Sequence, residues 1–518
     1  MPSEQRLHPA TLLFDLIKHI KAFAVPGVLV MIGASRSTGG PGGMFDGVPS
    51  GWETWLFVLL IPAVVITVAR YLSCRIVYAD NELVIRSGVF FRNERHVPYA
   101  RIQNVDAVQN PLHRLFQVVE VRVETGGGKE EEARLSVLSL AAFDEMKTHV
   151  MAGRSPLAGA VPVTDDAEPE PVATAEPLVH LSLRDVILCG LLENKGMVLV
   201  GAAAGLAWEA NTFGGSSWRV FGAAERMGYG VFRNLFRAVM AGGPLPLLQI
   251  GSAVAFVLGA LLLVRVVSMV WALVRLYDFR LTRVDDDLRS TFGLFTRVAT
   301  TVPIRRVQTV IVSASPLHRW LKRVTVRVET AGGVGPESGA TRVREWLAPL
   351  LHEPALPALL QQVLPDLELA ALAWQPLHPR AFARAVKPNL VVVATVTIIA
   401  AAIIGWGAIG VATLLMAWAI LSARQYVAYI GWAETDEVVA MRSGWLWQRL
   451  TIARVNKIQA VAMRESPFDR RAAMARVRVD TAGAGELARI DIPYLDGEVA
   501  RQLAGRLSAH AATTAFRW

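Results

Sequence analysis

The sequence predicts an α-plus-β membrane protein in which about six transmembrane helices, in three pairs, alternate with three copies of one strand-rich domain. Three observations support this fold class. One segment occurs three times, uncharged apolar runs precede its copies, and only 19% of the 518 residues are charged. Soluble proteins carry roughly 25% charged residues. Internal repeats set the architecture before any single element does, so they are considered first.

The repeated segment runs from Val97 to Gly127 and returns without gaps from Val302 onward. A more diverged third copy occupies residues 451–483. The matched positions are Pro98, Arg101, Gln103, Pro111, Arg114, Arg122, Glu124 and Thr125 in the first copy and Pro303, Arg306, Gln308, Pro316, Arg319, Arg327, Glu329 and Thr330 in the second. Five of them return as Gln459, Pro467, Arg470, Arg478 and Thr481. Chance does not give so many matches in one register, so the chain carries one domain three times.

Each copy has the pattern of several strands followed by one helix. In the first copy, Val119, Val121 and Val123 alternate with charged residues, which is the period of a half-buried strand. The segment 139–151 then has the spacing of an amphipathic helix. We therefore expect each domain to be strand-rich and closed by a C-terminal helix.

One glycine stands at the same position in all three copies, as Gly88, Gly293 and Gly444. It lies between two short apolar runs, which predicts a hairpin turn with a backbone conformation that glycine adopts readily. The conserved spacing therefore predicts the same turn three times within the chain.

The apolar runs predict where the chain crosses the membrane. The clearest span is 54–72, close to the roughly 20 residues that a bilayer core requires. Arg70 and Arg75 close this span and indicate that its end is cytoplasmic. Residues 218–240 carry regularly spaced arginines and aromatic residues, which predicts an interfacial amphipathic helix. The third pair is an uncharged hairpin around Trp406.

These patterns divide the chain into eight segments. In order, we expect a membrane helix pair at 12–73, the first repeat at 74–153, a disordered acidic and proline-rich linker at 154–179, a membrane helix pair with the interfacial segment at 180–275, the second repeat at 276–367, a basic linker at 368–388, a membrane hairpin at 389–423 and the third repeat at 424–509. If the repeats share the cytosolic side, an even number of spans must separate them.

Composition narrows the functional classes. The net charge of +9 indicates cytoplasmic flanks and contact with anionic lipid in a membrane protein, rather than nucleic-acid binding. Cys74 and Cys189 lack metal-type spacing and predict no disulfide framework. The first apolar run is not followed by a small-residue cleavage site, so we expect a retained span. No cofactor and no metal site are expected.

A strand-rich module with a C-terminal helix placed after paired spans resembles the membrane-flanked bacterial pleckstrin-homology-like (PH-like) domain, family 2. The resemblance is carried by the R-x-Q-x-V…P-L-H-R…V-R-V-E-T-x-G pattern at 101–126 and 306–331. The three-copy arrangement is similar to YdbS/YdbT-like multi-pass proteins. The third copy departs from the pattern at Lys457, Asp469 and Asp480. The resemblance implies barrels of about seven antiparallel strands capped by a helix, a place at the bacterial cytoplasmic membrane, and no catalytic residues.

The repeated basic positions are the candidate contacts for lipid or partner proteins. They are Arg101, Arg114 and Arg122 in the first copy, Arg306, Arg319 and Arg327 in the second, and Lys457, Arg470 and Arg478 in the third. On a domain tethered at the bilayer, anionic headgroups gain roughly 1 kcal/mol per well-placed cation. Solvated or internally paired strand arginines are the alternative interpretation.

Other polar positions suggest structure rather than chemistry. His113 and His318 lack metal-ligating neighbours and predict a short helical turn after Pro111 or Pro316, with the histidine bonded to backbone. The small residues Gly201, Gly205, Gly405 and Gly407 would suit close helix packing.

The resulting functional prediction is a non-enzymatic, multi-pass membrane protein. We expect three cytosolic domains that act as a scaffold, sensor or assembly factor at the cell envelope, with membrane lipids and proteins as partners. The alternative is a transporter or lipid-handling protein, which requires ionisable residues inside the spans. Arg265 and Glu209 are the ones that the sequence offers, with Glu193 and Lys195 near an end.

Overall fold

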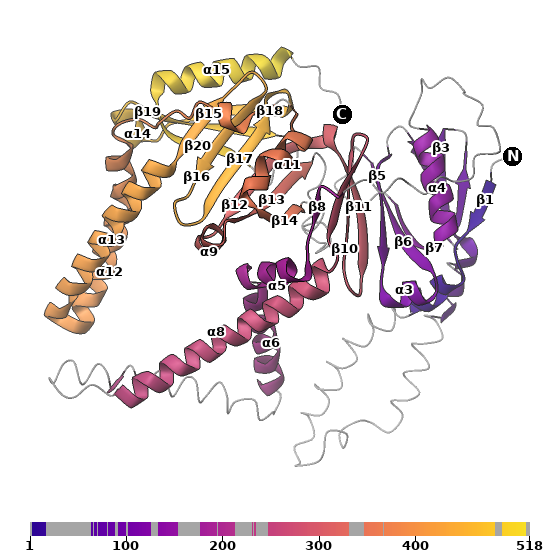
Figure 1. The fold of residues 1–518 in the computed structure, drawn as a ribbon, viewed down its shortest axis with the longest axis horizontal. Coiled ribbons are helices and arrows are strands. Elements are labelled where there is room, and N and C mark those ends of the chain that lie inside the picture. The colour runs from indigo at the N-terminus through magenta and orange to yellow at the C-terminus, as the bar shows by residue number, and fades with distance from the viewer. Residues whose placement is uncertain are drawn as a thin grey trace.

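The structure is a computed structural model, and three β-rich units lie in a row in it, with helices projecting from one side (Figure 1). It describes residues 3–16, 64–65, 67–69, 71–79, 81–88, 92–99, 102–125, 133–153, 177–193, 195–212, 230–231, 233–234, 247–330, 346–365, 367–481 and 489–513.

The first repeat consists of two antiparallel sheets with a shared core. One sheet has the order β1 (Ser3–Arg6), β2 (Arg75–Tyr78), β3 (Glu82–Ser87) and β4 (Asn93–Pro98). The second contains β5 (Ile102–Gln109), β6 (Val118–Thr125) and β7 (Ala133–Ser139), with α3 (Pro111–Leu115) between β5 and β6. Ile76 and Leu83 from one sheet and Val121 and Leu138 from the other are at most 1% exposed in one cluster. Met146 of α4 (Leu140–Gly153) joins them, so the predicted closing helix is confirmed.

The other two repeats share with the first the order of three strands, a strand, a short helix, two strands and a closing helix. The second has β8 (Val179–His180), β9 (Arg280–Val284), β10 (Asp287–Phe292), β11 (Arg297–Pro303), η2 (Ile304–Arg306), β12 (Val307–Ala314), α9 (Pro316–Trp320), β13 (Arg323–Thr330), β14 (Trp346–His352), η3 (Glu353–Ala355) and α11 (Leu356–Val363). The third has β15 (Gly431–Glu434), β16 (Val438–Ser443), β17 (Gln448–Arg454), η6 (Val455–Lys457), β18 (Ile458–Arg464), α14 (Pro467–Arg471), β19 (Met474–Thr481), β20 (Ile490–Asp496) and α15 (Gly497–Thr513).

The predicted glycine turns are confirmed in all three repeats. Gly88, Gly293 and Gly444 have φ angles of 111°, 115° and 75°, in the region that favours glycine. A Cβ on Gly293 would lie 2.0 Å from the carbonyl oxygen of Thr296, and one on Gly444 would lie 2.2 Å from that of Trp447. Both the backbone angle and the close approach therefore require glycine at this turn.

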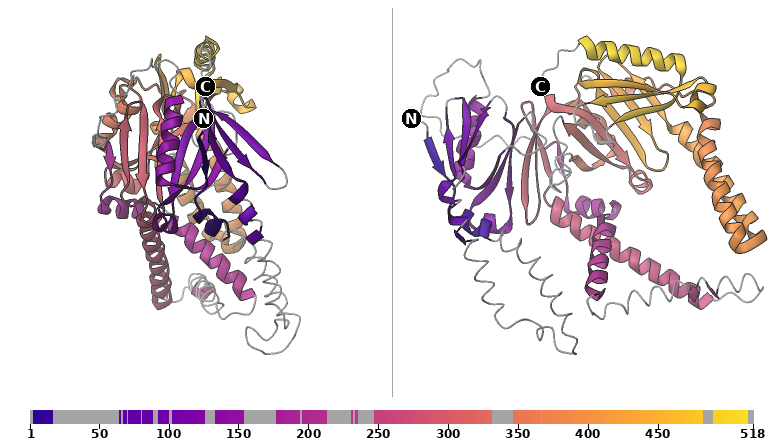
Figure 2. Two further views of the ribbon diagram at one scale, coloured as in Figure 1. Left: turned by 90° about the vertical axis from the view of Figure 1, so that its right-hand side faces the viewer. Right: turned by 180° about the vertical axis from the view of Figure 1, so that it is seen from behind.

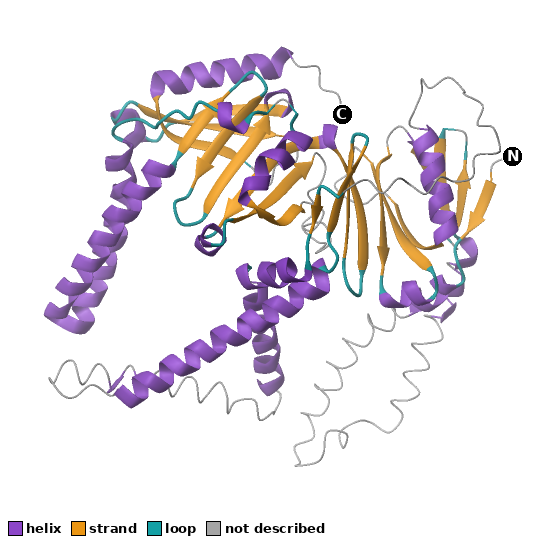
Figure 3. Cartoon of the chain, viewed as in Figure 1, coloured by secondary structure: helices purple, strands orange, loops and turns teal. Residues whose placement is uncertain are grey.

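Neighbouring repeats share their sheets, which the sequence did not predict. β5 of the first repeat pairs with β11 of the second, giving a seven-stranded sheet, and β12 of the second pairs with β17 of the third, giving a six-stranded sheet. Figure 3 shows the strands running on from one unit to the next. Backbone hydrogen bonds across these joins fix how the three domains sit relative to one another.

The described part of the chain contains three helices that are long and apolar enough to cross a membrane. They are α8 (Leu247–Leu276), α12 (Ala381–Ile404) and α13 (Ala408–Tyr429), and the turn η5 (Gly405–Gly407) separates the last two. Figures 1 and 2 show all three leaving the same side of the sheets. Most of 12–73 and of the segment 218–240 lies outside the described residues. The six-span count therefore stays a prediction.

Helix α12 begins at Ala381, so the end of the segment expected as a basic linker is helical and continues through Pro388. Contacts with the third repeat explain this early start. Arg384 Nε lies 2.8 Å from Asp469 Oδ1 of α14, and its guanidinium lies over the ring of Phe468. Ala381 and Ala385 are buried on the same helix. Tertiary contacts thus stabilise turns that the proline would weaken.

A short segment ahead of each membrane pair returns to the domain that follows the pair. β1 pairs with β2, β8 pairs with β9, and Gln375 bridges Trp432 in β15. Residues 10–16 are helical, and Phe14 packs in the first repeat, although 12–73 was assigned to the membrane. The recurrence of Leu-His-Pro at 7–9 and 377–379 was the available sequence signal for these returning segments.

Candidate functional site

The predicted arginines of the P-L-H-R motif, which reads P-F-D-R in the third repeat, lie on the short helices α3, α9 and α14. Arg114, Arg319 and Arg470 are all exposed there. Arg114 Nη1 donates to the carbonyl oxygen of Leu294 at 3.3 Å, and Thr296 Oγ1 donates to Asn110 Oδ1 at 3.1 Å. Both bonds join the first repeat to the β10–β11 turn of the second. In the first repeat this motif therefore helps to hold two domains together.

The motif histidines are structural, as expected. His113 is 3% exposed, stacks on Phe14 with a centroid distance of 4.0 Å, and accepts a hydrogen bond from the backbone N–H of Asn110. His318 Nδ1 lies 2.7 Å from Ser315 Oγ, so side chains rather than backbone satisfy this second ring. Burial lowers the pKa of His318. No group of three metal-ligating side chains occurs in the described residues.

Two of the remaining predicted residues occupy the single-turn helices that connect the sheets. Arg306 ends η2 and Lys457 ends η6, and both are half-buried. Burial, with the nearby charge of Arg454, lowers the pKa of Lys457. Arg101 and the side chain of Arg122 lie outside the described residues.

The strand arginines differ in what stands opposite them. Arg478 pairs in register with Asp491, whose carboxylate lies 3.1 Å from Arg478 Nη2. Arg327 pairs in register with Trp346 instead, and its guanidinium lies 5.4 Å from the centre of that ring. The Nε atoms of Arg327 and Arg478 are both buried without a hydrogen-bond partner. Within the described residues, however, Arg327 has no carboxylate in salt-bridge range. The third repeat thus pairs this arginine with a carboxylate, which it shares with Arg476, whereas the second repeat places no carboxylate opposite its arginine.

Arg327 belongs to a cluster of four cations, which we call the cationic junction. The other members are Lys195 of α6 (Lys195–Thr212), Arg275 in the last turn of α8, and Arg449 of β17. Lys195 Nζ lies 4.1 Å from the centre of the Trp346 ring, and Arg275 and Arg327 both repel it. Burial and the charge of Arg327 lower the pKa of Arg449.

One carboxylate faces the cationic junction in the described structure. Glu193 Oε2 lies 3.0 Å from Lys195 Nζ and also interacts with Arg275. Arg327 itself has no carboxylate in salt-bridge range within the described residues, so the junction keeps the positive charge of this residue. Because Arg275 closes a helix of membrane-spanning length, this charge lies at the end of a predicted span, where lipid headgroups are found.

Close helix packing fixes the membrane side of the cationic junction. The helix α5 (Leu183–Leu192) and the start of α6 pack on α8, where Ser268 Oγ accepts from the N–H of Gly196 at 2.7 Å and donates to the Glu193 carbonyl at 3.0 Å. A Cβ on Gly190 would lie 2.5 Å from Met269 Cα. No described atom lies within 4 Å of a Cβ on Gly201 or Gly205, so close packing at these two glycines stays a prediction.

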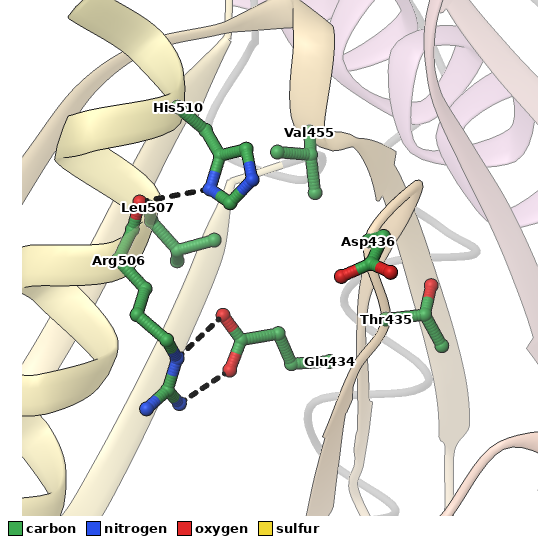
Figure 4. A pocket seen from close by; sticks show the side chains of 7 residues that line it. All are labelled: Glu434, Thr435, Asp436, Val455, Arg506, Leu507 and His510. Carbon is green, nitrogen blue, oxygen red and sulfur yellow. Dashed lines mark hydrogen bonds and ion pairs between the residues drawn. The ribbon is translucent and has the colours of Figure 1, made fainter.

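Cavities in the described part do not offer an alternative site of comparable chemistry. One of about 190 Å³ lies between α15 and the β15–β16 turn, and Figure 4 shows Arg506 paired there with Glu434 through two contacts. It is smaller than the roughly 300 Å³ of typical ligand pockets. A second of about 420 Å³ lies beside Trp432 and His378 and holds no cluster of unpaired charge.

Paired sheets, closing helices and helices of membrane-spanning length define a membrane-anchored protein of repeated PH-like domains. Comparison with known families agrees: the bacterial PH domain model matches residues 21–154, 241–366 and 371–511, and the chain belongs to this family. A similar protein is the UPF0699 transmembrane protein YdbT of Bacillus subtilis (strain 168), which is 22% identical over 383 residues and 71% of each chain. No solved structure matches this chain.

Proposed function

We propose that this protein is a non-enzymatic scaffold of the bacterial cytoplasmic membrane, and that its cationic junction binds the phosphate of anionic lipid headgroups. The observation that carries the proposal is the partly uncompensated positive charge of Arg327 and its neighbours at the end of helix α8. Phosphate oxygens would accept hydrogen bonds from the guanidinium of Arg327, which faces Trp346 rather than a carboxylate across the strand.

The shared sheets support the scaffold part of the proposal. Two sheets that each run through two repeats keep three PH-like domains in a fixed row beside the membrane helices. Independent domains on flexible linkers would instead move relative to one another. A rigid row presents several surfaces to envelope proteins at constant spacing, which suits an assembly or sensing role.

A transporter is the second class of function that the sequence left open. In the described spans α8, α12 and α13, Arg265 is the ionisable residue farthest from the helix ends. Ion and solute pathways through membranes usually contain several such groups. The described spans therefore favour an anchoring role over transport.

The lipid proposal is tested with the full-length protein purified in detergent. Thermal unfolding is followed while phosphatidylglycerol, phosphatidylcholine or inorganic phosphate is added. We expect phosphatidylglycerol to raise the midpoint temperature of unfolding. Arg327→Gln should weaken the apparent affinity of the protein for phosphatidylglycerol about five-fold, because one cation contributes roughly 1 kcal/mol.

The matched control is Arg478→Gln, because it removes the equivalent strand arginine at a position where the carboxylate of Asp491 is paired with it. We expect this variant to keep the affinity of the wild type for phosphatidylglycerol. An equal loss of phosphatidylglycerol affinity in both variants, or no loss of affinity in Arg327→Gln, would contradict the headgroup site. If inorganic phosphate raises the midpoint temperature of unfolding and phosphatidylglycerol does not, the site binds free anions instead.

A further inference from the structure

Two strands at opposite ends of the row lack the partner that their counterparts have. β11 and β17 each pair with a strand of the preceding repeat, but β4, the counterpart in the first repeat, pairs only with β3 in the described structure. Likewise β5 and β12 pair with the following repeat, whereas β18 pairs only with β19. The row therefore ends in two different open edges.

The two joins inside the chain use one register. Arg297 faces Gln109 and Ala299 faces Ala107 in the first join. The corresponding residues face each other in the second, where Gln448 lies opposite Ala314 and Leu450 opposite Val312. Two independent joins with identical register show that these edges are built to pair in one way.

From this we infer that β18 of one molecule pairs with β4 of a second copy, in the same register, and so extends the row head to tail. The inference concerns assembly and is independent of lipid binding. In this register Arg92 faces Glu465 of the neighbouring copy, and both are exposed. Neither internal join has opposite charges at this position, where Arg297 faces Gln109 and Gln448 faces Ala314. The unpaired edges therefore carry charge complementarity where the internal joins carry none.

The remaining surfaces of β18 are compatible with this contact. Its inner face is covered by α15, whose Ala500, Leu503 and Leu507 are fully buried in the core of the third repeat. On its outer face Ala460 and Ala462 are small and exposed, so a neighbouring strand can approach closely. Arg470, the counterpart of the interdomain residue Arg114, is exposed on α14 beside this edge.

The two edges differ, so the contact is heterologous and each added copy presents a new open edge. Such contacts form open rows, or rings if the rotation closes. The described membrane-spanning helices leave one side of the sheets, so a row can extend along the membrane surface (Figure 2). A contact between two identical β18 edges would instead stop at a dimer.

The test is disulfide crosslinking of the full-length chain in membranes, in a background of Cys74→Ser and Cys189→Ala. We expect Arg92→Cys with Glu465→Cys in one chain to give a ladder of dimers and larger species on a non-reducing gel. Each single variant should give monomer. A dimer from Glu465→Cys alone would overturn the head-to-tail contact in favour of paired β18 edges. Monomer in the double variant, with both cysteines reactive toward maleimide, would overturn the assembly altogether.

A charge-exchange series checks the register without cysteines. We expect Arg92→Glu or Glu465→Arg to reduce the fraction of crosslinked oligomer about two- to five-fold, because like charges then face each other. The crosslinker should be one that does not react with lysine amines. The double exchange should restore the fraction. Equal losses in the double exchange and the singles would refute the predicted pairing of these two residues.

Discussion

Gly196 offers a direct test of how the cationic junction is held, because two helices touch at its Cα. A Cβ at this position would lie 2.1 Å from the carbonyl oxygen of Val264 and 2.8 Å from the backbone nitrogen of Ser268. Ordinary contact begins at 3.4 Å, so Gly196→Ala must separate α6 from α8 by about 1.3 Å, the difference between 2.1 and 3.4 Å. The 2.7 Å bond from the Gly196 N–H to Ser268 would then break.

The expected cost follows from these two effects. Overpacking costs about 1–3 kcal/mol, and a buried N–H left unbonded costs about the same again. We therefore expect Gly196→Ala to destabilise the protein by about 2–4 kcal/mol, measured by thermal or denaturant unfolding of the full-length chain in detergent. The shift also displaces Lys195, so the response to phosphatidylglycerol should weaken.

Gly201→Ala on the same helix is the matched control. No described atom lies within 4 Å of a Cβ there, so the substitution should be neutral or stabilising by up to about 1 kcal/mol through helix propensity. If Gly196→Ala is no less stable than Gly201→Ala, the close approach of α6 to α8 is refuted, and with it the fixed position of Lys195 in the cationic junction.

Three further predictions concern the repeated P-L-H-R helices. Gln117, Lys322 and Ala473 follow these helices with φ near +52° to +54°, in the left-handed region. Lys322→Gly should therefore stabilise the fold by up to about 1 kcal/mol, measured by denaturant unfolding. Destabilisation by this substitution would argue against the left-handed backbone. Because burial lowers the pKa of His318, the folded state resists protonation. The stability should thus be full at a pH above the unfolded-state histidine pKa of about 6.5 and should fall as the pH drops below it. His318→Gln should reduce this dependence of stability on pH. An unchanged dependence would exclude His318 as its source. At Asp469, burial alone would raise the pKa, but hydrogen bonds from Ser466 and Arg384 outweigh burial and lower the pKa. The contribution of Asp469 to stability should be present at a pH above its unfolded-state pKa of about 3.9. It should be lost as the pH falls through the lower pKa of the folded state. Asp469→Ala should cost about 1 kcal/mol near pH 7, and an equal cost at pH 2 would contradict this source.

Repetition made several elements predictable from sequence. Gly88, Gly293 and Gly444 stand in one register, and a turn that requires a positive φ is the simplest physical reason for a repeated glycine. The proline that begins each short helix fixes the backbone of its first turn, which explains why the turns at Pro111 and Pro316 were expected, and α14 begins with a proline in the same way. These features depend on neighbours along the chain, and such neighbours can be read directly.

The candidate site was only partly predictable. Arg327 was selected because it recurs, but recurrence made it equivalent to Arg478. What separates them is the residue across the strand, which is Trp346 in one repeat and Asp491 in the other. Lys195, Arg275 and Arg449 were not selected, because they lie outside the repeated segment and far from Arg327 in sequence. No local pattern brings these four cations together.

The sequence by itself determined the three-fold repeat, the strand-rich domains with closing helices, the glycine turns and a membrane-anchored class of protein, since each follows from local pattern and composition. Only the tertiary structure decided that neighbouring repeats share sheets, that the P-L-H-R helix of the first repeat contacts the next domain, and that four cations meet at the end of α8. The physical reason is that edge-strand hydrogen bonds are made by backbone atoms, which are the same in every residue except proline and leave no mark in the side-chain sequence.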